Sequence, residues 1–90
     1  MQFEFDPVKS SANKAKHGID FEEAQKLWLD KNALRIRARN TGEERFAIVA
    51  ELNLKLWFAV YTERGPNIRI ITVRRARDNE KAHYHGRENR

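Results

Sequence analysis

Three strand-like segments separated by short turns occupy the second half of the chain and limit the folds available to it. They read "RFAIVAEL", "LWFAVYT" and "IRIITVRRA", with Asn53 between the first two and "RGPN" between the last two. The middle segment is almost continuously apolar, which is typical of a central strand covered on both faces. The sequence therefore predicts a β-sheet built largely from hairpins.

Alternation adds another strand and divides the last one between two faces. From residue 33 onward apolar residues alternate with Arg35, Arg37 and Arg39, which predicts a half-buried strand with a turn at "NTGE". In the last strand, strict alternation predicts two faces that each mix apolar and polar residues. One face would carry Ile68, Ile70, Thr72 and Arg74, and the other Arg69, Ile71, Val73 and Arg75.

The N-terminal part predicts a short strand and a first helix. "FEFD" at residues 3–6 suits a strand with both phenylalanines on one face. Asp6 is a suitable N-cap, Pro7 a suitable first helical residue, and Gly18 a left-handed stop. The expected apolar stripe of this helix consists of Val8, Ala12 and Ala15.

A second helix has a stronger start signal. Asp20 is its N-cap and Glu23, three residues later, completes a capping box. The helix is expected to end near Asp30, and its apolar stripe should face the sheet. That stripe consists of Phe21, Ala24, Leu27 and Trp28. A polar segment at residues 78–84 predicts a short third helix.

Composition indicates one small basic domain spanning residues 1–90, because 90 residues can bury only a single core. Eighteen Lys and Arg against thirteen Asp and Glu give a net charge of +5, which favours a polyanionic partner such as nucleic acid. The chain has no cysteine, no apolar run of membrane-spanning length and no signal-peptide pattern. A cytoplasmic location is therefore expected.

Arginines of the last hairpin are candidate phosphate ligands, since a guanidinium donates two parallel hydrogen bonds in the plane that a phosphate needs. They are Arg64, Arg69, Arg74 and Arg75. Alternatively, arginines at strand edges prevent edge-to-edge pairing of sheets. This second interpretation fits Arg35, Arg37 and Arg39 better.

Metal-independent RNA cleavage requires a base for the 2′-hydroxyl, cations beside the charged phosphorane and an acid for the leaving 5′-oxygen. The candidates for proton transfer are His17, Tyr61, Glu63 and Tyr84. Structural roles are open to them as well: His17 can bond carbonyl groups at a helix end, Tyr61 can pack across strands, and Glu63 can pair with an arginine.

The remaining aromatic and histidine residues carry weaker signals. Trp28, Trp57 and Phe58 are expected in the core rather than as stacking platforms for bases. His83 and His85 lie two residues apart without an accompanying acid triad, so no metal site is expected. No phosphate-binding loop or dinucleotide fingerprint is present, and no cofactor is expected.

Four blocks of the sequence together resemble the BrnT family, ribonuclease toxins of bacterial type II toxin–antitoxin systems. The blocks are "FEFDPVKSSANKAKHGIDFEEA", "GEERF", "VYTERGPNIRIITVRRA" and "ARDNEKAHY". The resemblance implies a RelE-like α+β fold, with a twisted, antiparallel-rich sheet, two N-terminal helices and a short C-terminal helix. It also implies metal-independent RNA cleavage that arrests translation.

The same resemblance implies a partner and a set of site residues. The partner would be a BrnA-like antitoxin with a ribbon-helix-helix domain, which binds operator DNA and forms a heterotetramer of two toxins and two antitoxins. The matching blocks supply Lys16, His17, Tyr61, Glu63, Arg64, Arg74 and Arg75. Of these, Arg64 and Arg74 are the expected transition-state cations, and His17 or Glu63 the expected proton acceptor.

Two other functions fit the composition equally well. One is a basic RNA- or DNA-binding module whose arginines only grip the backbone. The other is a degenerate toxin that retains its antitoxin contact and acts in operon autoregulation. Only the enzyme predicts that a single arginine substitution abolishes cleavage while weakening binding modestly.

Overall fold

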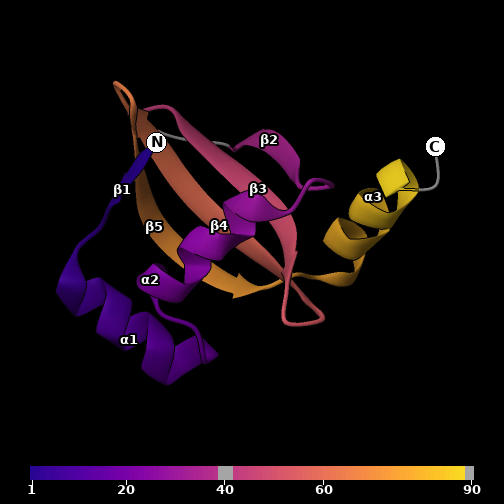
Figure 1. Cartoon of the computed structure of the whole chain (residues 1–90), viewed down its shortest axis with the longest axis horizontal. Helices are drawn as coiled ribbons and strands as arrows, with labels where there is room; N and C mark the ends of the chain where they lie inside the picture. The colour runs from indigo at the N-terminus through magenta and orange to yellow at the C-terminus, as the bar shows by residue number, and fades with distance from the viewer. Residues whose placement is uncertain (39–41, 89–90) are drawn as a thin grey trace.

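The computed structural model describes residues 1–38 and 42–88, which form one five-stranded sheet with helices on both of its faces (Figure 1). The sheet order is β1-β5-β4-β3-β2. The strands are β1 (Gln2–Glu4), β2 (Leu34–Ala38), β3 (Arg45–Leu52), β4 (Lys55–Arg64) and β5 (Asn67–Arg75). The helices are α1 (Pro7–His17), α2 (Phe21–Ala24), the 3-10 helix η1 (Gln25–Leu29) and α3 (Asp78–Glu88).

Strand β1 pairs in parallel with β5, and all other neighbouring strands are antiparallel. This arrangement confirms the predicted α+β class with a largely antiparallel sheet, whereas the RelE-like assignment stays a prediction. Among the described helices, none has the length and apolar character needed to cross a membrane.

Both turns expected between the last three strands are present. Asn53 and Leu54 connect β3 to β4 with φ angles of 55° and 66°, and Gly65 adopts a φ of 59° between β4 and β5. Asn53 and Gly65 tolerate this left-handed conformation, whereas Leu54 adopts it at an energetic cost. The nearly continuous apolar segment becomes β4, the central strand, as predicted. Arg39 and part of the "NTGE" turn lie outside the described residues.

Helix α1 begins and ends as predicted, but the prediction of its buried face was wrong. Asp6 accepts hydrogen bonds from the first turn, and Gly18 ends the helix with a φ of 81°. Val8 is 77% exposed, and Ala12 and Ala15 are exposed as well. The buried side chains are Ser10 and Asn13, because both are needed as hydrogen-bonding groups between α1 and its neighbours.

The capping box of the second helix is confirmed, because Asp20 and Glu23 each accept a hydrogen bond from the other's backbone N–H. The helix tightens from α2 into η1 after one turn and stops at Asp30, close to the expected end. All four residues of its predicted apolar stripe are buried. Trp28 packs edge-on against the rings of Phe3 and Tyr61, at centroid distances of 5.1 Å each.

The two faces of the sheet are covered unequally. One, here called the covered face, packs against α2 and η1 and forms the main core. Its strand residues are Ile48, Ala50, Trp57, Ala59, Tyr61, Ile68, Ile70 and Val73. The opposite one, here called the arginine face, contacts α3 at one end through a smaller cluster. That cluster consists of Val49, Leu56, Ala76 and Tyr84, with Leu34 and Phe58 beside it.

A hydrogen bond ties α3 to the helix layer on the other side. The Tyr84 hydroxyl donates to Oδ2 of Asp30 at 2.7 Å, and the backbone N–H of Glu51 donates to the same oxygen at 2.8 Å. Burial opposes ionisation of Asp30, but hydrogen bonds from Glu51, Tyr84 and Asn32 outweigh it and lower its pKa. In Figure 1, α3 lies at the far side of the sheet from α1.

Candidate nucleic-acid interface

A β-bulge in β5 decides which arginines share a face. Val60 pairs with Thr72 and Tyr61 with Ile70, so Ile71 has no counterpart in β4. The extra residue shifts the alternation by one position. Arg69 and Arg74, which strict alternation puts on opposite faces, consequently lie on the same one. The predicted division of this strand was therefore wrong beyond the bulge.

The arginine face now carries three polar side chains in a row along β5. Arg69 pairs with Thr62 and Arg74 with Phe58, and both partners alternate away from the buried ring of Tyr61. Thr72 lies between the two arginines and is exposed. A row of two guanidinium groups and a hydroxyl along one strand can contact successive phosphates of a single-stranded nucleic acid.

Arg74 is the most constrained cation of this row. It donates to both carboxylate oxygens of Glu80, at 2.9 and 2.8 Å, and its guanidinium carbon lies 4.2 Å from the centre of the Phe58 ring. Its side chain is 23% exposed and that of Glu80 14%. Burial opposes ionisation of Glu80, but hydrogen bonds from Arg74 and from the backbone of Arg77 outweigh it and lower its pKa.

Arg69 and Arg64 are held more loosely. Arg69 contacts Glu4 at 3.4 Å, and Arg64, at the end of β4, contacts Glu43 at 3.3 Å. Both pairs are long and partly solvent-exposed, so each contributes little to stability. These guanidinium groups can therefore exchange a carboxylate for a phosphate at small cost.

A basic hollow of about 220 Å³ adjoins the row at the edge of β5. Its lining consists of Lys9, Ala12, Asn13, Lys16, His17, Phe21, Ile71 and Thr72. Thr72 thus belongs to both the hollow and the arginine row. Within residues 1–38 and 42–88, neither Lys9 nor Lys16 has a carboxylate partner, so both cations are available to a phosphate.

Asn13 fixes this part of α1 against the strand. Its side-chain amide donates to the carbonyl of Val73 at 3.0 Å, and its oxygen accepts from the N–H of the same residue at 3.2 Å. The amide also donates to the carbonyl of Ile19 at 2.8 Å. Asn13 therefore satisfies backbone groups of β5 beyond the segment that pairs with β1, and His17, one turn later on α1, lines the same hollow as Thr72.

Three predicted site residues lie elsewhere. Tyr61 is 3% exposed in the main core, and Glu63 follows the alternation of the covered face at the exposed end of β4. Burial raises the pKa of Tyr61, despite the nearby charge of Arg35. Arg75 lies over the Trp57 ring at 5.5 Å, also on the covered face. The structure therefore brings together Lys16, His17, Arg69 and Arg74 around Thr72, and separates them from these three.

Sequence reasoning missed Glu80, Asn13 and Thr72 as parts of this surface. Glu80 was unremarkable as an acid in a polar helix, although its position three residues after Arg77 is typical of a first-turn acid that accepts from the helix N-terminus. Asn13 was hidden within a helix of small residues. No local pattern in the sequence marks Asn13, because its role depends on its burial, and a buried Asn side chain requires hydrogen-bond partners.

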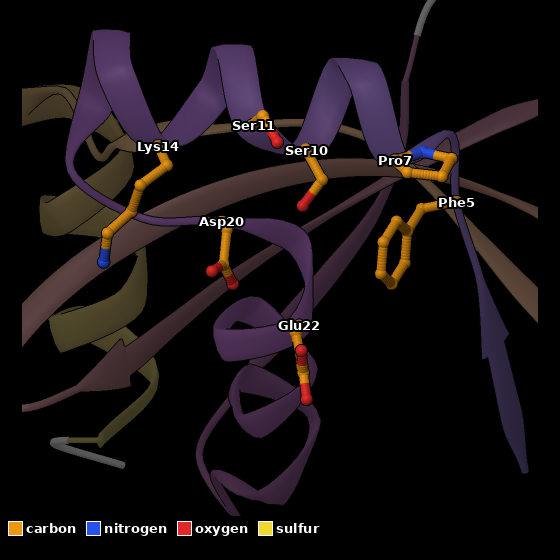
Figure 2. Close-up of a pocket in the computed structure, with 7 residues that line it drawn as sticks. All are labelled: Phe5, Pro7, Ser10, Ser11, Lys14, Asp20 and Glu22. Atoms are coloured by element: carbon orange, nitrogen blue, oxygen red, sulfur yellow. The ribbon is translucent and has the colours of Figure 1, made fainter.

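Another hollow of the surface has a mixed charge and no excess of cations. The hollow between α1 and α2, of about 370 Å³, is lined by both acidic and basic groups, with Lys14 and Ser10 on one helix and the carboxylates of Asp20 and Glu22 on the other segment (Figure 2). Lys14 already pairs with Glu23 at 2.7 Å. In the described ranges, no group of three or more acidic, His or Cys residues is placed to hold a metal ion.

Comparison with known proteins gives the chain a family. No curated protein matches it significantly. Residues 5–80 match the family described as the ribonuclease toxin BrnT of type II toxin–antitoxin systems, and this range includes α1, the arginine row and Glu80. Because the match spans most of the 90 residues, the chain belongs to the BrnT family of ribonuclease toxins.

Proposed function

We propose that the protein is a metal-independent endoribonuclease that arrests translation, and that its substrate lies along β5 on the arginine face. One observation carries this proposal. The β-bulge aligns Arg69, Thr72 and Arg74 beside the hollow that holds Lys16 and His17, in a chain whose family consists of ribonuclease toxins. Cations and one imidazole thus surround the exposed residue Thr72.

The roles follow from the chemistry of each group. His17 accepts the proton of the 2′-hydroxyl, whose oxygen then attacks the adjacent phosphorus. Arg74 stabilises the extra negative charge of the phosphorane, and Lys16 and Arg69 bind neighbouring phosphates. The 5′-oxygen leaves with a proton from water, which reaches this exposed surface. The products are a 2′,3′-cyclic phosphate and a 5′-hydroxyl.

Membership of a type II system implies a protein antitoxin. We infer that this partner is a BrnA-like ribbon-helix-helix protein, that it forms a heterotetramer of two toxins and two antitoxins, and that the complex binds operator DNA through the antitoxin. An acidic or amphipathic segment of the antitoxin would cover the arginine face, where its charge is complementary to Arg69, Arg74 and Lys16.

Expression in a bacterial host tests the enzymatic proposal. Wild type should arrest growth and degrade RNA, and both His17→Ala and Arg74→Lys should relieve the arrest. The matched control is Arg75→Lys, which alters the neighbouring arginine on the covered face and should remain toxic. The purified wild type should cleave RNA equally well with and without a chelator. Folded wild-type protein that binds RNA and leaves it intact would instead support a binding module or a degenerate toxin.

A further inference from the structure

The hydrogen bonds of Arg74 leave one edge of its guanidinium unused. Nη1 donates to Oε1 of Glu80 at 2.9 Å and to the carbonyl of Arg75 at 3.1 Å, while Nη2 donates to Oε2 of Glu80 at 2.8 Å. A guanidinium has five N–H groups, and these bonds use three of them. Among the described residues, the N–H of Nε and the second N–H of Nη2 have no acceptor.

These two N–H groups form a fork. They point in parallel from the same side of the planar group, which is the geometry that two oxygens of a phosphate accept. Glu80 occupies the Nη1–Nη2 end of Arg74. A second oxyanion can therefore bind at the Nε–Nη2 edge without breaking that contact. The exposed Thr72 hydroxyl lies two residues earlier on the same face.

Three contacts of the guanidinium fix the orientation of this fork: the Phe58 ring, the Glu80 carboxylate and the Arg75 carbonyl. The Phe58 ring lies 4.2 Å from the guanidinium carbon, and Glu80 is itself held by the backbone N–H of Arg77 at 2.8 Å. The side chains of Arg74 and Glu80 are mostly buried. Because the arginine has already lost its rotamer freedom, binding a ligand requires little further ordering.

We propose that the Nε–Nη2 edge of Arg74 is a binding site for one phosphodiester group, and that Glu80 of α3 is the positioning residue that orients it. The identification of the ligand as RNA rests on the proposed function. Among the described residues, the hydrogen-bond partners of Glu80 are Arg74 and the backbone of Arg77, so it acts through Arg74 rather than on substrate.

Nuclear magnetic resonance of the arginine Nε–H groups tests the site directly. The probe is an uncleavable 2′-O-methyl oligoribonucleotide, and the Arg74 signal is assigned by its loss in Arg74→Lys. In wild type this signal should shift saturably on titration. In Glu80→Gln the shift at saturation should fall at least threefold. An unchanged wild-type signal, or a larger shift in Glu80→Gln, would overturn the proposal, the latter because Glu80 would then compete with RNA for Arg74.

Tyr84→Phe tests whether Glu80 orients Arg74 or only attaches α3 to the sheet. It removes the hydrogen bond from this helix to Asp30 and leaves the Arg74–Glu80 pair untouched. The Arg74 shift should remain as in wild type. If Tyr84→Phe loses the shift as fully as Glu80→Gln, Glu80 only docks the helix and the positioning role is wrong.

Cleavage kinetics provide a second readout. Under single-turnover conditions Glu80→Gln should cleave RNA about tenfold more slowly, while its affinity for the uncleavable probe stays within about twofold, because charge is retained at Arg74 and only its orientation is lost. Faster cleavage would contradict the proposal. A wild type that shows the Arg74 shift without cleaving RNA would remove the proposed enzymatic function and leave this site supported.

Discussion

The two faces of the sheet carry the same residue types, arginine and aromatic residues, in different roles. On the covered face Tyr61 packs between aromatic rings and Arg75 lies over Trp57. On the arginine face Arg74 lies over Phe58, but it also bonds a carboxylate, and one edge of its guanidinium has no acceptor among the described residues. Arg74 and Arg75 are neighbours in the sequence, yet strand alternation gives them separate surroundings. Residue type alone therefore says little about function in this strand.

The faces also differ in how their helices are attached. The covered face holds α2 and η1 through a continuous apolar core, and Asn13 bonds α1 to the edge of β5. The arginine face holds α3 through a small cluster and through polar contacts that include Arg74–Glu80 and Tyr84–Asp30. We therefore expect the covered face to dominate stability and the arginine face to dominate RNA binding.

The largest expected effect is on the covered face. Tyr61→Ala should lower the free energy of unfolding by about 3–5 kcal/mol, because it removes a buried ring that packs against Trp28 and Phe46. Tyr61→Phe keeps the ring, and should retain RNA cleavage within about twofold. Denaturant unfolding and a cleavage assay measure the two effects. A Tyr61→Phe protein that is folded but inactive would contradict the division between the faces.

A smaller effect is expected where α1 meets the edge of β5. Asn13→Ala should cost about 2–3 kcal/mol of unfolding free energy, because the N–H of Val73 and the carbonyls of Val73 and Ile19 lose buried partners. Amide hydrogen exchange should show earlier opening at Val73 than at the strand centre. The matched control is Ala12→Ser on the exposed side of the helix, which should change stability little.

On the arginine face, Arg69→Gln should affect binding rather than folding. Its ion pair with Glu4 is long and partly exposed, so the free energy of unfolding should change by less than about 0.5 kcal/mol. Affinity for single-stranded RNA should fall about fivefold at low salt, and the slope of log affinity against log salt should fall by about 0.7. The control is Arg37→Gln on β2, which loses an exposed ion pair with Glu44. Equal losses in both variants would indicate non-specific attraction.

The smallest expected effect is a loss of local stability in α3 at acidic pH. Asp30 and Glu80 both have folded-state pKa values lowered below their ordinary values of 3.8 and 4.5. A lowered pKa stabilises the folded state above the unfolded value, and this contribution is lost as pH falls through the folded value. Because both carboxylates hold α3, the protection of α3 amides against hydrogen exchange should fall as pH drops below these ordinary values, before that of β4 falls. Simultaneous opening of α3 and β4 would show that the faces are not independent.

Local signals in the sequence predicted most of the fold. Asp6, Gly18 and the Asp20–Glu23 box act through neighbouring backbone groups, so their effects can be read from a few residues. The turn at Asn53 and the central apolar strand follow the same logic. Each of these features depends on contacts within a short segment, which is why it was predictable.

Features that depend on distant partners were not predictable. The bulge at Ile71 has no signature in the alternating sequence around it, and a shift of one residue there reversed the faces of every later side chain. The buried face of α1 was missed because Asn13 serves a strand sixty residues away. Four of the candidate residues, Lys16, His17, Arg69 and Arg74, were named in advance, but their common surface depends on that bulge.

Photo-cross-linking of RNA to the intact protein identifies the strands and helices that bind the substrate. An oligoribonucleotide carrying 4-thiouridine would be irradiated with the protein, and the cross-linked peptides identified by mass spectrometry. We expect cross-links in β5 between Arg69 and Arg74 and in α1 around Lys16 and His17, with few in η1 on the covered face. Cross-links confined to α2, η1 or the β3–β4 turn would contradict this expectation, because RNA would then bind away from the arginine face.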